Sequence, residues 1–175
     1  MNLVRRTLVP ALGAALLLAV AAPTASADFY PPGRPNGPVP ETGMLVNANS
    51  GKCLEVAASS TDNGAAVQQW DCDGGENQLW DFNSGIPGAI VNVHSGKCLD
   101  ATGGGGDPVQ QWDCDGGANQ AWNWYRDRSW ESYALLDGRF GLALDIRGWS
   151  TENGAEAESF SWNDGDNQSW RVVRP

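Results

Sequence analysis

The nine residues Val67-Gln68-Gln69-Trp70-Asp71-Cys72-Asp73-Gly74-Gly75 occur twice in this chain, because residues 109–117 repeat them without a change. The segment Ser50-Gly51-Lys52-Cys53-Leu54 likewise returns as residues 95–99. The first pair of segments is separated by 42 residues and the second by 45. Self-similarity at a period of this size indicates that the chain is built from repeated supersecondary units.

A third, more diverged copy follows the first two. It runs through Gly141-Leu142-Ala143-Leu144-Asp145 and ends at Asn167-Gln168-Ser169-Trp170. Cys53, Cys98 and Ala143 are 45 residues apart at each step, whereas Trp80, Trp122 and Trp170 are 42 and then 48 residues apart. The middle repeat is therefore three residues shorter after Asp100, and a longer connection around residues 125–133 restores the register.

Short apolar runs recur inside each unit. Met44-Leu45-Val46 and Ala89-Ile90-Val91 are typical, and each run is bounded by Asn, Ser, Gly or Asp. Beyond the N-terminal segment, no stretch offers apolar residues at helical spacing over a useful length, so the pattern predicts an all-β protein of short strands. Three copies with nothing left over predict closure around a pseudo-threefold axis, with repeats at about residues 44–87, 88–132 and 133–175.

The N-terminus has the pattern of an export signal. Residues 1–6 carry two arginines, residues 8–22 are almost entirely apolar, and Ala25-Ser26-Ala27 supplies small residues before Asp28. This order of charged, apolar and cleavage regions predicts a secretory signal peptide over residues 1–27. The apolar run falls short of the roughly 20 residues that span a bilayer. We therefore expect a secreted, extracellular protein without membrane insertion.

A proline-rich segment follows the predicted signal. Residues 28–43 contain five of the ten prolines, a composition that favours an extended linker over packed structure. We expect the fold to begin near Met44 and to continue to residue 175. One domain of this length is large enough for an ordinary core.

The charge of the chain excludes several classes of partner. The formal net charge is −10, and without residues 1–27 the 9 basic and 21 acidic residues give −12. A body this acidic repels nucleic acid and anionic membrane surfaces. We expect no nucleic-acid partner, and a monomer.

The four cysteines predict two disulfides, because an exported protein folds in an oxidising compartment. Of the three possible connectivities, only Cys53–Cys72 with Cys98–Cys114 keeps each bridge inside its own repeat. Each bridge would stabilise the fold by roughly 3 kcal/mol. Ala143 and Trp162 replace the third pair, and we expect the large side chain to fill the space of the missing bridge. With one His and no CxxC motif, no metal or cofactor is expected.

Three Q-x-W triplets carry a family resemblance: Gln78-Leu79-Trp80, Gln120-Ala121-Trp122 and Gln168-Ser169-Trp170. With C-L-D/E and W-x-C around them, they resemble the threefold signature of ricin B-chain-type lectins, also called family 13 carbohydrate-binding modules. The resemblance covers residues 44–175. It implies a β-trefoil that binds sugars in shallow pockets, up to one per repeat.

The resemblance also implies a set of sugar-binding residues in each repeat. The set consists of a carboxylate after C-L, an aromatic residue two positions before the second cysteine, and the Asn and Gln before x-W. An aromatic ring suits the apolar face of a pyranose, and a carboxylate with an amide suits its hydroxyls. In the family the Asn faces the sugar and the Gln holds the carboxylate. Mapped by motif, the three sets are Glu55, Trp70, Asn77 and Gln78; Asp100, Trp112, Asn119 and Gln120; and Asp145, Phe160, Asn167 and Gln168.

Each set departs from the family pattern in one respect. The first has Glu55 in place of Asp, the second has the shortened loop after Asp100, and the third has Phe160 in place of Trp. Because Glu is one methylene longer, we expect its carboxylate to be displaced, and we rank the third and second sites above the first. Gln68 and Gln110 are candidates for an added contact, and Glu158 stands at the third equivalent position.

Other tryptophans are assigned by position. Trp80, Trp122 and Trp170 are predicted to fill a shared core. Trp149 lies in the third repeat at the position of Ser59, where it either extends the pocket or anchors the loop by packing.

Parts of the sequence also suggest functional classes other than a lectin. Asp71-x-Asp73-x-Gly75 is similar to the start of a calcium loop, but Phe82 stands where that loop needs an acid, so turn chemistry explains it better. A protein-binding trefoil, such as a protease inhibitor or the targeting subunit of a toxin, stays open as an alternative. A small glycosidase is the other alternative, although no catalytic residue can be singled out from the sequence. We expect a non-enzymatic lectin that binds glycans weakly and multivalently.

Overall fold

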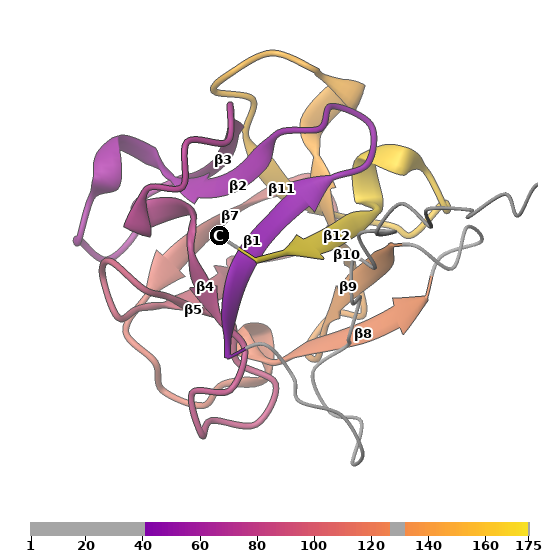
Figure 1. Ribbon diagram of the computed structural model, residues 1–175. Coiled ribbons are helices and arrows are strands. Elements are labelled where there is room, and N and C mark those ends of the chain that lie inside the picture. The colour runs from indigo at the N-terminus through magenta and orange to yellow at the C-terminus, as the bar shows by residue number, and fades with distance from the viewer. Residues whose placement is uncertain (1–40, 127–131, 175) are drawn as a thin grey trace, which may run out of the picture.

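The computed structural model describes residues 41–126 and 132–174 (Figure 1). The predicted signal peptide and nearly all of the predicted linker lie outside the described residues. Twelve strands and five short 3-10 helices make up the described part, which confirms the all-β prediction. The first strand begins at Thr42, two residues before the expected start of the fold, because Thr42 and Gly43 pair with Asp81 and Trp80.

Each repeat contributes four strands. In the first repeat they are β1 (Thr42–Asn47), β2 (Cys53–Val56), β3 (Val67–Trp70) and β4 (Trp80–Asp81). The second has β5 (Val91–Asn92), β6 (Cys98–Ala101), β7 (Asp107–Trp112) and β8 (Trp122–Arg126). The third has β9 (Tyr133–Asp137), β10 (Ala143–Ile146), β11 (Ala157–Phe160) and β12 (Trp170–Val173).

The outer strands of the repeats form a barrel, and the inner strands form three hairpins. The barrel runs through the antiparallel pairs β1–β4, β4–β5, β8–β9, β9–β12 and β12–β1. Between β5 and β8, the Trp122 amide donates to the Gly88 carbonyl (2.8 Å). The hairpins are β2–β3, β6–β7 and β10–β11 (Figure 1). This is the β-trefoil that the family resemblance implies, and it agrees with the threefold closure that the repeats predict.

The core lies where the three repeats meet. Trp80, Trp122 and Trp170 are all buried, and each indole N–H donates to a backbone carbonyl at 3.0 Å, that of Leu54, Leu99 or Leu144. Burying a tryptophan contributes a large apolar area, and its N–H needs a partner when it is buried. The prediction that these three residues fill a shared core is confirmed.

Both predicted disulfides are present, Cys53–Cys72 and Cys98–Cys114. The expectation for the third repeat is wrong. Ala143 is buried, but Trp162 is 45% exposed and lies beside Tyr125, with ring centroids 6.3 Å apart. The reason is geometric: the second cysteine of the first bridge is itself exposed, so its counterpart in the third repeat falls at the surface.

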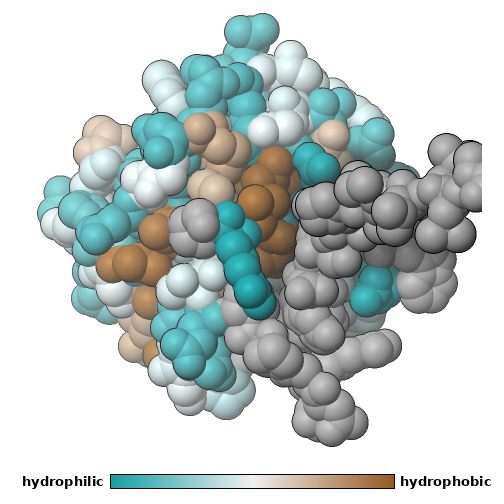
Figure 2. Space-filling model, in the orientation of Figure 1, coloured by the Kyte–Doolittle hydropathy of each residue, from teal (hydrophilic) through white to brown (hydrophobic). Residues whose placement is uncertain are grey.

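Polar and neutral residues cover most of the described surface seen in Figure 2, and hydrophobic residues gather there in small patches, one of them over β1 and β12. The helices of the described residues span three residues each, and none is long and apolar enough to cross a membrane.

Candidate functional site

A carboxylate occupies the same place on the central hairpin of every repeat. The strand register sets Glu55 opposite Gln68, Asp100 opposite Gln110, and Asp145 opposite Glu158. All three carboxylates belong to buried residues. A buried charge needs hydrogen-bond partners to offset its lost hydration, so the partners of these groups define the three sites.

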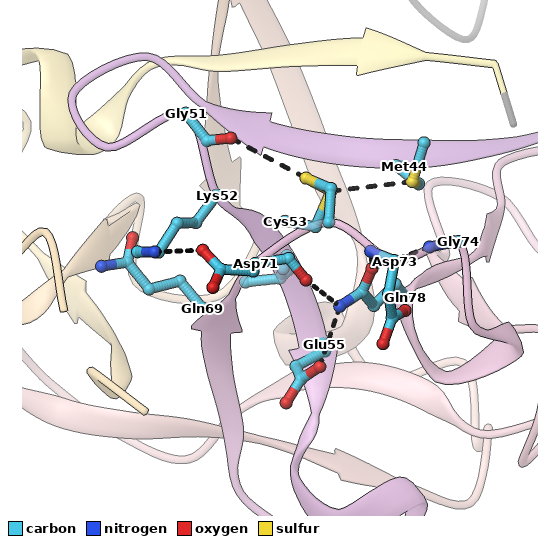
Figure 3. Close-up of a disulfide and its surroundings, with 12 residues drawn as sticks. Met44, Gly51, Lys52, Cys53, Glu55, Gln69, Asp71, Asp73, Gly74 and Gln78 are labelled. Atoms are coloured by element: carbon cyan, nitrogen blue, oxygen red, sulfur yellow. Dashed lines mark hydrogen bonds and ion pairs between the residues drawn. A yellow bond between two sulfur atoms is a disulfide. The ribbon is translucent and has the colours of Figure 1, made fainter. Parts of the chain in front are cut away.

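Three side-chain amides hold the carboxylate of the first repeat. Gln78 Nε2 donates to Glu55 Oε2 (3.0 Å) and also to the Asp71 carbonyl (2.9 Å) (Figure 3). Asn77 Nδ2 donates to the same Oε2 (3.3 Å), and Gln68 Nε2 donates to Oε1 (2.8 Å). Glu55 therefore reaches the amides that its motif predicts, despite the extra methylene.

The second repeat repeats this arrangement with a shorter acid. Gln120 and Asn119 donate to Asp100 Oδ2 at 3.0 and 2.8 Å, and Gln110 donates to Oδ1 at 3.1 Å. The glutamine of the Q-x-W motif holds the carboxylate in position, as predicted. Gln68 and Gln110 do the same from the opposite strand, which the sequence did not assign to them.

The third repeat has two amide donors and a second acid. Asn167 and Gln168 each donate to Asp145 Oδ2 at 2.9 Å. Glu158, at the position of Gln68 and Gln110, has no amide to donate; its Oε2 lies 3.0 Å from Arg147 Nη2 instead. Burial and then the charge of Glu158 raise the pKa of Asp145 to about 6, although the amides of Gln168 and Asn167 act in the opposite direction.

An exposed aromatic ring accompanies each buried carboxylate. Trp70, Trp112 and Phe160 are the last residues of β3, β7 and β11, and 41%, 41% and 42% of their surfaces are exposed. Each lies two residues beyond Gln68, Gln110 or Glu158, and therefore on the same face of its strand. An exposed aromatic residue thus recurs at the equivalent position of every repeat, beside the buried carboxylate.

The short loop of the second repeat alters its own pocket. In the first and third repeats, a 3-10 helix follows the carboxylate strand: η1 (Ala57–Ser59) and η4 (Arg147–Trp149). Within the described residues, the second repeat has no such helix between β6 and β7. The shorter loop after Asp100 therefore leaves the second repeat without the 3-10 helix that borders the carboxylate strand in the other two.

Loops of one repeat border the aromatic ring of another. Gln69 Nε2 donates to the carbonyls of Ser150 (2.9 Å) and Glu152 (3.0 Å), and this fastens the third-repeat loop beside β3. A Cβ placed on Gly154 of that loop would lie 3.6 Å from the ring of Trp70. Gln111 donates in the same way to the carbonyls of Ser60 and Asp62, at 2.9 and 3.0 Å.

These glutamine contacts between repeats were not predicted. The sequence did contain a signal for them. The pair Gln68-Gln69 recurs unchanged as Gln110-Gln111 in the second repeat, whereas the third repeat has Glu158-Ser159 at these positions. In the third repeat, Ser159 stands where the glutamine would be, and its side chain has no amide group to donate to loop carbonyls. The short loop of the second repeat is held there by the backbone instead, because the Gly106 amide donates to the Ser159 carbonyl (2.7 Å).

Aspartates around the sites form turns and ion pairs. Asp73 Oδ1 accepts a hydrogen bond from the Gly75 amide (2.8 Å), and Asp115 does the same for Gly117 (2.7 Å). The turn chemistry predicted for the D-x-D-x-G motif is confirmed. Asp71 pairs with Lys52, whose hydrogen bond holds the pKa of Asp71 below its usual value.

A family model described as ricin-type beta-trefoil lectin domain-like matches residues 37–88 and 83–158. Several solved structures are similar to the chain. The designed threefold-symmetric protein ThreeFoil is 38% identical, with a TM-score of 0.70, and the match covers 78% of this chain and 100% of that one. An exo-β-1,3-galactanase from Clostridium thermocellum is 35% identical, with a TM-score of 0.71, and 79% of this chain matches 31% of the enzyme.

The third structure is the C-half of an earthworm R-type lectin in complex with GalNAc. It is 20% identical with a TM-score of 0.66, and the match covers 78% of this chain and 100% of that one. At this identity the likeness concerns the fold alone.

Proposed function

The chain belongs to the ricin-type β-trefoil lectin domain-like family, and from this premise we propose that it is a lectin that binds glycans or polysaccharides through its three repeats. One observation carries the proposal: in every repeat an exposed aromatic ring stands on the strand face that bears a buried, amide-held carboxylate. The ring suits the apolar face of a pyranose, and the carboxylate accepts hydrogen bonds from its hydroxyls.

Binding at each site is weak, and binding to a polymer is stronger. A shallow site with one ring and a few hydrogen bonds gives roughly millimolar affinity, about −4 kcal/mol. Sites on one rigid trefoil raise the avidity for a polysaccharide by about 100-fold or more. Isothermal titration should therefore give much tighter binding to a polymer than to its monosaccharide. Equal affinities would contradict multivalent binding.

Side-chain substitutions in the second site provide the direct test. Asp100→Asn removes the charge but keeps the size, and Trp112→Ala removes the exposed ring; each should abolish retention at this site. Asp81→Asn is the matched control, because Asp81 lies outside the three sets and an amide oxygen can still accept the Asn83 amide. A glycan array identifies the ligand. GalNAc and β-1,3-galactan are the first probes, since one similar structure is a complex with GalNAc and another is an exo-β-1,3-galactanase. If no sugar is retained by the unaltered protein, the proposal fails.

We propose that the chain does not hydrolyse sugars. The carboxylates of the first two sites are occupied by three amide donors each, which suits binding better than proton transfer. The alternative, a glycosidase, finds most support in the third repeat. There Asp145 faces a second acid, Glu158, and the pKa of Asp145 is raised to about 6. Glycosidases use two carboxylates, one of them with a raised pKa. Release of reducing sugar that disappears in Glu158→Gln would establish the alternative.

Secretion completes the proposal and rests on the sequence pattern of residues 1–27. Cleavage after Ala27 would leave Asp28 as the first residue. N-terminal sequencing of the protein recovered from culture medium tests this directly.

A further inference from the structure

Trp149 distinguishes the third site from the other two. It is the last residue of η4, it has a φ of +57°, and its side chain is 52% exposed. Its ring lies against Gly165, the residue before η5 (Asp166–Gln168): a Cβ on Gly165 would lie 2.6 Å from Trp149 Cζ2 and 2.7 Å from Cη2. Only glycine leaves room for the ring in this position.

The ring therefore lies beside the amide oxygen of the third site. The point where a Gly165 Cβ would stand is also 2.7 Å from Asn167 Oδ1. Asn167 Nδ2 donates to Asp145 and to the Ile146 carbonyl, so Oδ1 is the atom left to accept a hydroxyl. Yet Asn167 is only 2% exposed, and its Oδ1 is buried with no partner among the described residues.

The other two repeats leave this amide oxygen open. At the equivalent Gly75 and Gly117, the nearest atoms to a Cβ are the side-chain oxygens of the site asparagine and of a turn aspartate. Asn77 and Asn119 are both half-buried, in contrast to Asn167. Ser59 stands at the Trp149 position of the first repeat with a similar φ of +49°, and the second repeat lacks the 3-10 helix.

The position of the Trp149 ring over Asn167 brings one gain and one cost. The ring gains contact with Gly165 but leaves half of its surface in water. In exchange, a buried acceptor goes without a donor, which costs free energy that a sugar hydroxyl would recover. The ring and a sugar hydroxyl therefore compete for the same space next to Asn167.

We propose that Trp149 is the specificity-determining residue of the third site: its indole keeps a monosaccharide from Asn167, so the site binds sugar only when the indole is displaced. This inference rests on the proposed lectin function. It implies that the third site binds a monosaccharide more weakly than the first, whereas the sequence-based ranking places the third site above the first.

A reciprocal exchange of residues tests the inference. Trp149→Ser gives the third repeat the residue of the first, and Ser59→Trp gives the first repeat the residue of the third. The backbone at both positions already has a positive φ that a non-glycine residue occupies. Amide shifts of each repeat, followed during titration with the monosaccharide identified on the array, report the sites separately.

Trp149→Ser should tighten monosaccharide binding at the third site by about tenfold, and Ser59→Trp should weaken it at the first by a similar factor. In Trp149→Ser the first and second sites should keep their affinities. Weaker third-site binding in Trp149→Ser would overturn the inference, because it would make the indole a sugar contact. Unchanged binding at both exchanged sites would overturn it as well.

A measurement without sugar keeps the inference separate from the lectin proposal. Exchange of the Asn167 side-chain amide protons with water should be slower than that of Asn77 and Asn119 in the unaltered protein, and should rise toward theirs in Trp149→Ser. Equal exchange rates in the unaltered protein would overturn the inference. If exchange behaves as expected but no repeat responds to any sugar, the cover exists and the lectin proposal fails.

Discussion

The first and third repeats hold a carboxylate in the same place by different means. Glu55 receives three side-chain amide donors, whereas Asp145 receives two and faces the carboxylate of Glu158 where the third donor would be. The first repeat also has a disulfide, and the third has an arginine ion pair from Arg147 to Glu158. Divergence of one repeat thus leaves the fold intact and changes the electrostatics and the cover of its site.

A neutral amide and an acid are not interchangeable at the position opposite the carboxylate, which Gln68 occupies in the first repeat and Glu158 in the third. A glutamine donates to the neighbouring carboxylate and stabilises its charged form, whereas an acid repels it. Asp145 faces Glu158 on the paired strand, and Glu158 pairs with Arg147, which also lies near Glu156. Burial, with the charge of Glu158 added to it, raises the pKa of Asp145, so the stability of the third repeat depends on pH.

The largest expected difference concerns the disulfides. Replacing Cys98 and Cys114 together by Ala should lower the free energy of unfolding by about 3 kcal/mol, because the bridge restricts the unfolded chain. Replacing Cys53 and Cys72 together should lower it by a similar amount. Urea unfolding of each variant, compared with the unaltered oxidised protein, gives the two free-energy differences. Hydrogen exchange in reduced protein should rise most in the first two repeats, and an equal rise in the third would contradict the comparison.

The next effect is the pH dependence of the third repeat. Because its pKa is raised to about 6, folded Asp145 keeps a proton between about pH 4 and 6 that the unfolded chain has already released. The free energy of unfolding should therefore fall as pH rises through this window, by an amount on the order of 2 kcal/mol. The measurement is the difference in stability between the unaltered protein and Asp145→Asn, which cannot titrate.

Glu158→Gln sharpens this test, because it supplies the residue that the first two repeats use. The pKa of Asp145 should fall, since the repulsion disappears and a donor is added, and the slope of stability between pH 4 and 6 should become smaller. A slope that is unchanged in Glu158→Gln would mean that burial alone raises the pKa.

A smaller effect is expected from the glutamines that fasten loops. Gln69→Ala and Gln111→Ala each remove two hydrogen bonds to loop carbonyls and should cost about 1–2 kcal/mol in unfolding free energy. Ser159→Ala is the matched variant of the third repeat. Because the Ser159 hydroxyl is buried with no partner among the described residues, its removal should cost nothing measurable. An equal loss of unfolding free energy in Ser159→Ala and Gln69→Ala would show that the glutamines do not fasten the loops more strongly than the serine does.

The fold could be predicted from the sequence because each repeat brings equivalent residues to the shared core. Trp80 and its two equivalents are spaced with the repeat, and each is buried as predicted. The carboxylates and the Q-x-W glutamines were found for the same reason, since their contacts lie inside one repeat. Trp162 was misplaced because the loss of a bridge does not reveal which end of it lay at the surface. The position of Trp149 over Gly165 was also out of reach, since it depends on how two loops approach each other.

The smallest expected effect is the difference in sugar affinity between the first and second sites. The sequence predicted a displaced carboxylate at the first site, because Glu55 is longer than Asp100. Asn77 and Gln78 reach Glu55 at 3.3 and 3.0 Å, while their counterparts reach Asp100 at 2.8 and 3.0 Å. The longer acid therefore keeps both amides, and only the asparagine contact is lengthened. Lengthening one of several hydrogen bonds costs a fraction of its roughly 1 kcal/mol.

Glu55→Asp should thus strengthen sugar binding at the first site by no more than about threefold, and Asp100→Glu should weaken the second by a similar factor. Amide shifts of the two repeats during one titration give both affinities under identical conditions. The second site is the internal control for Glu55→Asp, and the first is the control for Asp100→Glu. A change above about tenfold in either direction would mean that the extra methylene positions Glu55 for a different hydroxyl, because the amides that hold it differ too little to account for such an effect.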